Sequence, residues 1–285
     1  NCCFIRVSHA RICAVPGSSL PFCTTICICL REISVKNTSI FSLVGAVLAL
    51  SISYTTLADE FSVSTGSRPF SAGLGILYKD KPYRDYDSDE KTNLVPVILF
   101  EGESFFVRGS ILGWKFIDNN GLEFAAIGEY LADGYESSDS DFLRGMDDRD
   151  PSLGVGAHVI WNPDALGFKM SAVTDVADNS DGQQVRGEVF YKYRTGDWMF
   201  KPSAGFVWQS DDYNDYYYGV KNRETFNAIG RRPYSANDDF NYRLGAVAVY
   251  QQKTSPWMFA GGLRYDILGD EITDSPIVSE DDEMT

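Results

Sequence analysis

The residues best suited to chemistry begin with one histidine. His158 is the single histidine in residues 59–285, and along 153–161 it alternates with apolar residues, so it faces the polar side of that segment. A histidine can act as general base for a serine, and Ser171 lies across the predicted turn at 162–165. A lone inward histidine more often serves as a hydrogen-bonded polar filler. We therefore predict no catalytic residue, with a lipid-modifying barrel enzyme built around His158 as the third alternative.

A second set of candidate residues is charged and lies on the polar side of alternating segments. Inside a narrow barrel such side chains would pair and fill the interior. The alternative is a small channel whose mixed charge screens solutes electrostatically. We favour the filled interior. The set comprises Arg108, Lys169, Arg186, Glu188, Lys192, Arg194, Lys201, Arg243 and Arg264, interspersed with Glu123 and Asp266.

Two further clusters lie between the alternating segments. Residues 132–151 are strongly acidic, and we predict a solvated loop, with a Ca²⁺- or Mg²⁺-bridged contact to lipopolysaccharide as the alternative. The tyrosines of 213–218 are predicted to form an interfacial belt, the alternative being a binding surface. The sequence contains no P-loop, G-x-G-x-x-G after a strand, H-E-x-x-H or G-x-S-x-G, so we expect no cofactor and no metal.

The segments that position these residues alternate between apolar and polar side chains, as half-buried strands do. Each is about ten residues long, enough for a tilted strand to cross a membrane, and aromatic residues lie near the ends of the apolar stripes. The sequence therefore predicts an all-β fold, a transmembrane antiparallel up-and-down β-barrel; a soluble β-sandwich is the alternative. The runs lie at 71–79, 104–117, 121–131, 152–161, 166–175, 184–194, 198–209, 240–251 and 257–267.

The connections alternate in length, as in bacterial outer-membrane barrels. Tight turns at 162–164, 195–197 and 253–256 contrast with long acidic loops near 132–151, 176–183 and 210–239. This pattern predicts nine spanning strands, with Asn93–Glu101 as a hairpin arm or loop extension and 279–285 as an acidic loop. An even number is needed when both termini face the periplasm. We therefore expect about ten strands, the last one missing from this chain, or twelve if 93–101 also spans.

The N-terminal region is predicted to be absent from the exported protein. Lys36, the apolar stretch 40–50 and Thr56-Leu57-Ala58 make residues 35–58 a cleaved signal peptide, with a single N-terminal anchor as the alternative. Residues 1–34 are then spurious upstream translation. They hold all six cysteines, whose spacing does not favour a zinc site or a disulfide framework. The exported barrel would span residues 59–285.

Composition excludes several classes of protein. The chain has 25 basic and 40 acidic residues and a net charge of −15, which argues against a nucleic-acid partner. A mean hydropathy of −0.19 excludes a bundle of several apolar membrane helices. The 44% of hydrophobic residues excludes a disordered chain.

Several motifs in 70–278 together resemble the MipA/OmpV family of outer-membrane proteins. The most specific are Tyr217-Tyr218-Gly219-Val220 and Asp274-Ser275-Pro276-Ile277-Val278, in this order and spacing. They are accompanied by Gly73-Leu74-Gly75, Tyr83-Arg84-Asp85-Tyr86, Phe105-Phe106-Val107-Arg108-Gly109 and Leu143-Arg144-Gly145-Met146-Asp147. Family members usually continue past Asp-Ser-Pro into a strand that ends in an aromatic residue.

The resemblance implies a structural role rather than a catalytic one. The family's founding member is thought to scaffold murein synthesis and hydrolysis by bridging a lytic transglycosylase and a penicillin-binding protein. Other members are described as porin-like proteins, adhesins or factors in antibiotic susceptibility. We therefore predict a non-enzymatic protein of the outer membrane, in contact with its lipid and lipopolysaccharide and with a murein hydrolase and synthase as partners. A narrow porin-like channel is the alternative.

Overall fold

The computed structural model describes residues 70–86, 92–279 and 282–285. The cysteine-rich segment 1–34 and the signal peptide 35–58 lie outside these residues, so both assignments stay predictions.

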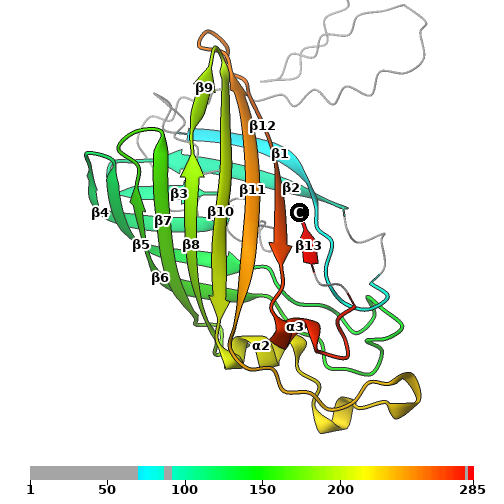
Figure 1. Cartoon of the computed structure of the whole chain (residues 1–285). Coiled ribbons are helices and arrows are strands. Elements are labelled where there is room, and N and C mark those ends of the chain that lie inside the picture. The colour runs from blue at the N-terminus through cyan, green and yellow to red at the C-terminus, as the bar shows by residue number, and fades with distance from the viewer. Residues whose placement is uncertain (1–69, 87–91, 280–281) are drawn as a thin grey trace, which may run out of the picture.

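In these residues, thirteen antiparallel strands form one strongly curved sheet, in which each strand pairs with its neighbour in the chain (Figure 1). The exception is β9, which continues the line of β8 and pairs with β10. This is the predicted up-and-down arrangement. The strands are β1 (Phe70–Tyr78), β2 (Thr92–Glu101), β3 (Phe105–Arg108), β4 (Ile111–Asn119), β5 (Leu122–Leu131), β6 (Ser152–Trp161), β7 (Leu166–Asp175), β8 (Gln183–Tyr191), β9 (Tyr193–Thr195), β10 (Trp198–Gln209), β11 (Asp239–Gln251), β12 (Met258–Ile267) and β13 (Asp282–Met284).

The outer face of this sheet is apolar and its inner face is largely polar. On β11, Leu244 is 53% exposed on the outer face, whereas Asn241 on the inner face is 5% exposed. Leu263 and Arg264 of β12 show the same division. A sandwich would bury its apolar face against a second sheet, but here that face is the exposed one. An apolar exterior of this extent fits a lipid environment, so the β-sandwich alternative is wrong.

Three strand assignments made from the sequence need correction. Residues 92–101 form a full strand, β2, paired with all of β1, and not a hairpin arm. This strand is apolar on both faces, since Leu94 faces outward while Val95 and Leu99 are buried inside. Its sequence therefore does not alternate between apolar and polar residues as the other strands do. The predicted strand 104–117 is two strands, since the chain reverses at Gly109, which has a φ of 63°. Residues 282–284 form β13 rather than a loop.

The two edges of the sheet approach each other at one place. The segment after β1 runs beside the segment that leads into β13, where Tyr83 and Val278 form an antiparallel bridge. Asp80 N donates to Met284 O at 2.9 Å, and Ser279 N donates to Pro82 O at 3.0 Å. Over the rest of their length the edges of the described sheet are not joined.

Most connections between the strands gather at two opposite ends of the barrel, long ones at one end and short ones at the other, as the alternating lengths predict (Figure 1). Those after β1, β5, β7, β10 and β12 gather at what we call the loop end, where Figure 1 shows α2 (Asp211–Tyr218) and α3 (Asp270–Thr273) at the bottom. The loop after β10 also holds the short helices η3 (Asn222–Glu224) and η4 (Asn227–Ile229). The opposite, turn end carries the turns after β2, β4, β6, β9 and β11. Among the described residues, no helix has the length and apolar character to cross a membrane.

Candidate functional site

The interior of the barrel wall holds a chain of paired charges around the predicted histidine. Arg108 of β3 reaches two carboxylates, with 2.8 Å to Glu101 Oε1 and 2.8 Å to Glu123 Oε1. Glu123 Oε1 also lies 2.7 Å from His158 Nε2. The His158 ring stacks on Phe106, with 5.6 Å between ring centroids. His158 therefore faces the lumen as predicted and is held by a carboxylate and an aromatic ring.

Ser171 lies beside His158 but makes no catalytic contact with it. The two residues are opposite each other in the pairing of β6 with β7. His158 Nδ1 and Ser171 Oγ are both buried, and neither has a hydrogen-bond partner among the described residues. Activation of a serine nucleophile needs its hydroxyl within hydrogen-bond reach of the base. His158 and Ser171 are thus neighbours in the sheet, but no hydrogen bond connects their side chains.

Most of the other predicted inner-face charges also lie against opposite charges or polar groups, whereas Arg194 is exposed on β9. Arg186 pairs with Glu129, a partner that the sequence analysis did not identify. Both Arg243 and Arg264 contact Asp266, at 2.5 Å and 2.8 Å. Lys201 Nζ lies 3.4 Å from Glu188, Lys169 is opposite Glu188 in the strand register, and Lys192 Nζ donates to Asn162 Oδ1 at 2.5 Å.

Part of the lumen is a small cavity among these side chains. Its volume is about 70 Å³, and it lies between the charged inner face and the loop end, lined among others by Arg186, Arg243 and Arg264. Toward the turn end, Met199, Val247 and Val249 form a small buried apolar cluster on the inner face of β10 and β11. This cavity has room for a few water molecules between paired charges.

At the loop end, the two most specific sequence motifs contact each other. Ser275 Oγ donates to Tyr218 O at 2.6 Å, and Val220 bridges to Tyr234. Tyr213 and Tyr217 of α2 have no exposed surface. They pack with residues of the other loops, including Tyr83 and Tyr135, in one apolar core. We call this assembly of loops the cap.

The buried positions of these tyrosines contradict the predicted interfacial belt. A belt residue keeps its ring at the membrane surface, whereas burial raises the pKa of Tyr217 well above its usual range. Tyr234, which is partly exposed, has its pKa raised to about 12 by desolvation and by nearby Glu271. The tyrosine run is therefore the core of the cap. Gly219 ends α2, and Asp274 and Pro276 flank Ser275 at the end of α3.

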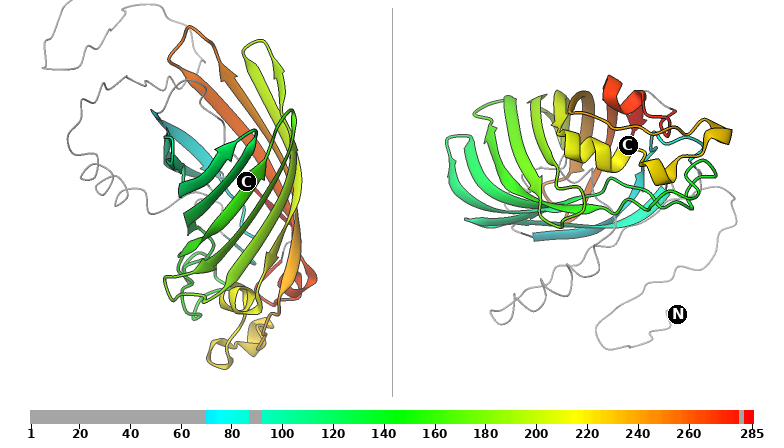
Figure 2. Two further views of the ribbon diagram at one scale, coloured as in Figure 1. Left: turned by 90° about the vertical axis from the view of Figure 1, so that its left-hand side faces the viewer. Right: turned by 90° about the horizontal axis from the view of Figure 1, so that it is seen from below.

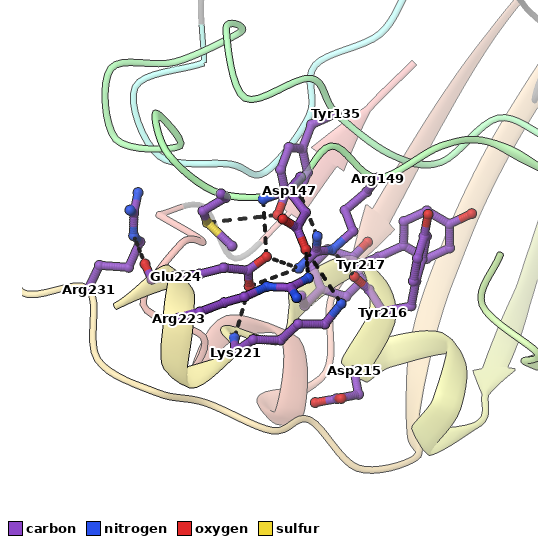
Figure 3. Close-up of polar contacts among 12 residues, drawn as sticks. Tyr135, Asp147, Arg149, Asp215, Tyr216, Tyr217, Lys221, Arg223, Glu224 and Arg231 are labelled. Atoms are coloured by element: carbon purple, nitrogen blue, oxygen red, sulfur yellow. Dashed lines mark hydrogen bonds and ion pairs between the residues drawn. The ribbon is translucent and has the colours of Figure 1, made fainter. Parts of the chain in front are cut away.

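A fully buried ion pair joins the two longest loops of the cap (Figure 3). Arg149 of loop 132–151 and Glu224 of η3 lie 3.0 Å apart, and each side chain is only 1% exposed. Arg149 also donates to Tyr216 O at 2.6 Å and to Asp147 O at 2.9 Å. Such a pair is costly to bury and needs these extra hydrogen bonds. The sequence does not predict this pair, because a single arginine within Asp-Asp-Arg-Asp carries no periodic signal.

A second set of charges joins the cap to the edge of the sheet. Lys79 Nζ lies 2.9 Å from Asp133 and 3.1 Å from Glu283. Burial alone would raise the pKa of Asp133, but Lys79 and the hydroxyl of Tyr213 outweigh it and hold that pKa below its usual range. Asp133 is therefore structural, in contrast to the solvated loop predicted for 132–151. Other acidic residues of the loop, such as Asp141, are exposed. Within the described ranges, no cluster of metal-ligating residues is placed to hold an ion.

The sequence of this capped sheet was compared with known proteins. The family described as "MltA-interacting protein MipA" matches residues 72–285. The chain belongs to this family. It is 32% identical over 227 residues to the MltA-interacting protein of Escherichia coli K12, covering 79% of this chain and 90% of the relative. It is 30% identical to the putative outer membrane protein YiaT of E. coli O157:H7, covering 80% and 92% of the two chains.

A more distant member of the family is the outer membrane protein OmpV of Vibrio cholerae, 26% identical over 248 residues and covering 85% and 93% of the two chains. No solved structure matches the chain significantly. The match confirms the resemblance drawn from the Tyr-Tyr-Gly-Val and Asp-Ser-Pro motifs. Together with the apolar exterior, it establishes an outer-membrane protein of the MipA/OmpV type. The names of these relatives describe location or interaction, and none of the three states a catalytic activity.

Proposed function

We propose that this protein is a non-enzymatic scaffold of the outer membrane, surrounded by lipid and lipopolysaccharide, that binds a murein hydrolase and synthase. One observation carries the proposal: the lumen is filled by paired charges and covered by a cap with its own buried core. A barrel built in this way offers surfaces rather than a passage. The name of the E. coli K12 relative supports a murein enzyme as the partner, because it records an interaction with MltA.

The turn end supplies the surface for a periplasmic partner. Outer-membrane barrels direct their short turns to the periplasm and their long loops outward. Most turns here are too short to dock a protein, but the hairpins β9–β10 and β11–β12 reach beyond the neighbouring strands (Figures 1 and 2). Arg194 and Lys253 are exposed on them, and the stacked rings of Trp198 and Phe200 lie on the outer face of β10. We therefore place the docking surface on these two hairpins.

Two other functions have weaker support. A narrow channel would use the 70 Å³ cavity, but paired charges such as Arg108 with Glu101 and Lys201 with Glu188 lie on the turn side of it. A lipid-modifying enzyme would use His158, whose Nε2 is engaged by Glu123 and whose Nδ1 does not reach Ser171. Replacing His158 with Ala leaves partner binding intact if the scaffold proposal is correct.

Affinity isolation from detergent-solubilised outer membranes tests the proposal. The wild-type protein should recover a murein hydrolase or synthase at near-stoichiometric yield. The double variant Arg194→Glu with Lys253→Glu should lose that recovery, whereas Arg144→Glu at the loop end should retain it. Arg144 is a matched control, because its side chain is also exposed. Recovery of lipopolysaccharide alone by the wild-type protein would contradict the murein-scaffold proposal.

A further inference from the structure

A finger of the cap projects outward at the loop end. We use this name for residues 221–232, seen as the gold segment beyond α2 in Figures 1 and 2. Its tip is a small hairpin in which Phe226 N donates to Arg231 O at 2.8 Å, and Gly230 has a φ of 81°. The tip presents Phe226, 51% exposed, and Ile229, 39% exposed. Because the finger lies beyond the ends of the strands, lipid acyl chains do not account for these exposed side chains.

The finger is anchored by buried charge. Arg231 is 3% exposed and donates through Nε to Glu224 O at 2.7 Å. Its guanidinium also reaches the carbonyl oxygens of Phe142 and Arg144 in the neighbouring loop. Glu224, on the same finger, forms the buried pair with Arg149. These contacts hold the backbone below the tip, and Phe226 and Ile229 lie exposed above it.

The exposed charges of the finger are basic, unlike those of the surrounding cap. Residues 221–232 contain four basic residues and one acidic residue, in a chain whose net charge is −15. Lys221 and Arg223 are 50% and 68% exposed, and both lie near Asp147. Arg232 is exposed, and its side chain has no ion pair or hydrogen bond within the described part of the chain. The finger thus combines an apolar tip with one exposed cation, Arg232, that is available to an external anion, and with two more, Lys221 and Arg223, that share Asp147.

We infer that the finger binds the phosphorylated inner-core sugars of lipopolysaccharide. Arginine forms paired hydrogen bonds with phosphate, and lysine adds a point charge. The ring of Phe226 offers a flat apolar face for the C–H side of a sugar. The inference deepens the proposed contact with lipopolysaccharide and rests on it, since it names the residues of this chain that make that contact.

Binding of purified lipopolysaccharide to the full chain in detergent micelles tests the inference. Two preparations serve as probes, one with inner-core phosphates and one from a strain that lacks them. The variant Phe226→Ser with Arg232→Ser should bind the phosphorylated preparation about tenfold more weakly, the effect of losing one charge-assisted hydrogen bond at a partly exposed site. The control Arg144→Ser, which removes an exposed arginine from the neighbouring loop, should bind like the wild-type protein.

Each outcome bears on a different claim. If the wild-type protein binds neither preparation, the proposed contact with lipopolysaccharide fails and the inference fails with it. If it binds both preparations equally, or if the finger variant binds as the wild type does, only the inference fails. Loss of a co-purifying acidic protein from the finger variant, with lipopolysaccharide binding unchanged, would also overturn it. Heat-modifiable electrophoretic mobility verifies that each variant is folded.

Discussion

The barrel wall and the cap bury opposite kinds of side chain. The wall directs apolar residues such as Leu244 outward and charged residues such as Arg243 inward. The cap instead has a tyrosine-rich apolar core, and its most buried charges, Arg149 and Glu224, lie against that core. The difference follows from the solvent: lipid surrounds the wall, whereas water surrounds the cap. One chain therefore folds a membrane protein and a small water-soluble layer on top of it.

The largest effect should come from breaking the buried pair of the cap. Replacing Glu224 with Ala leaves Arg149 buried without its partner, so we expect a loss of about 3–5 kcal/mol in the free energy of unfolding. The double variant Arg149→Met with Glu224→Leu should be far less damaging, because it leaves no unpaired charge. Urea titration of the refolded protein measures both. Equal losses in the single and double variants would contradict this view of the cap.

A charge on the outer face of the wall should cost nearly as much. Leu244→Arg places a cation in the apolar band of β11, where such a change costs about 2–4 kcal/mol at the middle of the bilayer. Leu244→Phe keeps the face apolar and should cost little. The yield and stability of refolding into lipid vesicles distinguish the two variants. If both refold alike, the outer face of the wall does not contact lipid.

Acid should weaken the link between the cap and the sheet. The pKa of Asp133 is lowered in the folded protein, so its stabilising effect is present above the unfolded pKa of about 4 and is lost as the pH falls toward the folded value. Protease resistance of the cap should therefore decrease below about pH 4. In Asp133→Asn, which cannot titrate, this step should be absent. If the protease resistance of Asp133→Asn falls with pH as that of the wild-type protein does, a group other than Asp133 causes the loss.

The smallest effect should come from the exposed pair of the cap. Arg223 and Asp147 are 68% and 45% exposed, and exposed pairs contribute about 0–1 kcal/mol. Arg223→Gln should therefore leave the urea midpoint almost unchanged. Both ion pairs join the same two loops, so a larger loss of stability in Glu224→Ala than in Arg223→Gln would be caused by the burial of the Arg149–Glu224 pair. A large loss for Arg223→Gln would remove that distinction.

The wall could largely be predicted from the sequence, because lipid on one side and a polar lumen on the other impose a period of two. That rule failed at β2, where Val95 and Leu99 make the inner face apolar as well. It failed again at β13, because a run of acidic residues is typical of a solvated loop, whereas Glu283 pairs with Lys79 in the structure. The cap has no such period. Its tyrosine core and its buried pair depend on contacts between residues 75 positions apart, which no local pattern reveals.

Single-channel recording in a planar lipid bilayer tests the central claim most directly, namely that the filled lumen and the cap make this barrel a binding surface and not a passage. The refolded wild-type protein should give no stable current steps under conditions in which a general porin, added as a control, conducts. Reproducible, protein-dependent steps of constant size from the wild-type protein would contradict the claim, because ions would then cross a lumen that the paired charges of Arg108, Arg186 and Arg264 are proposed to fill.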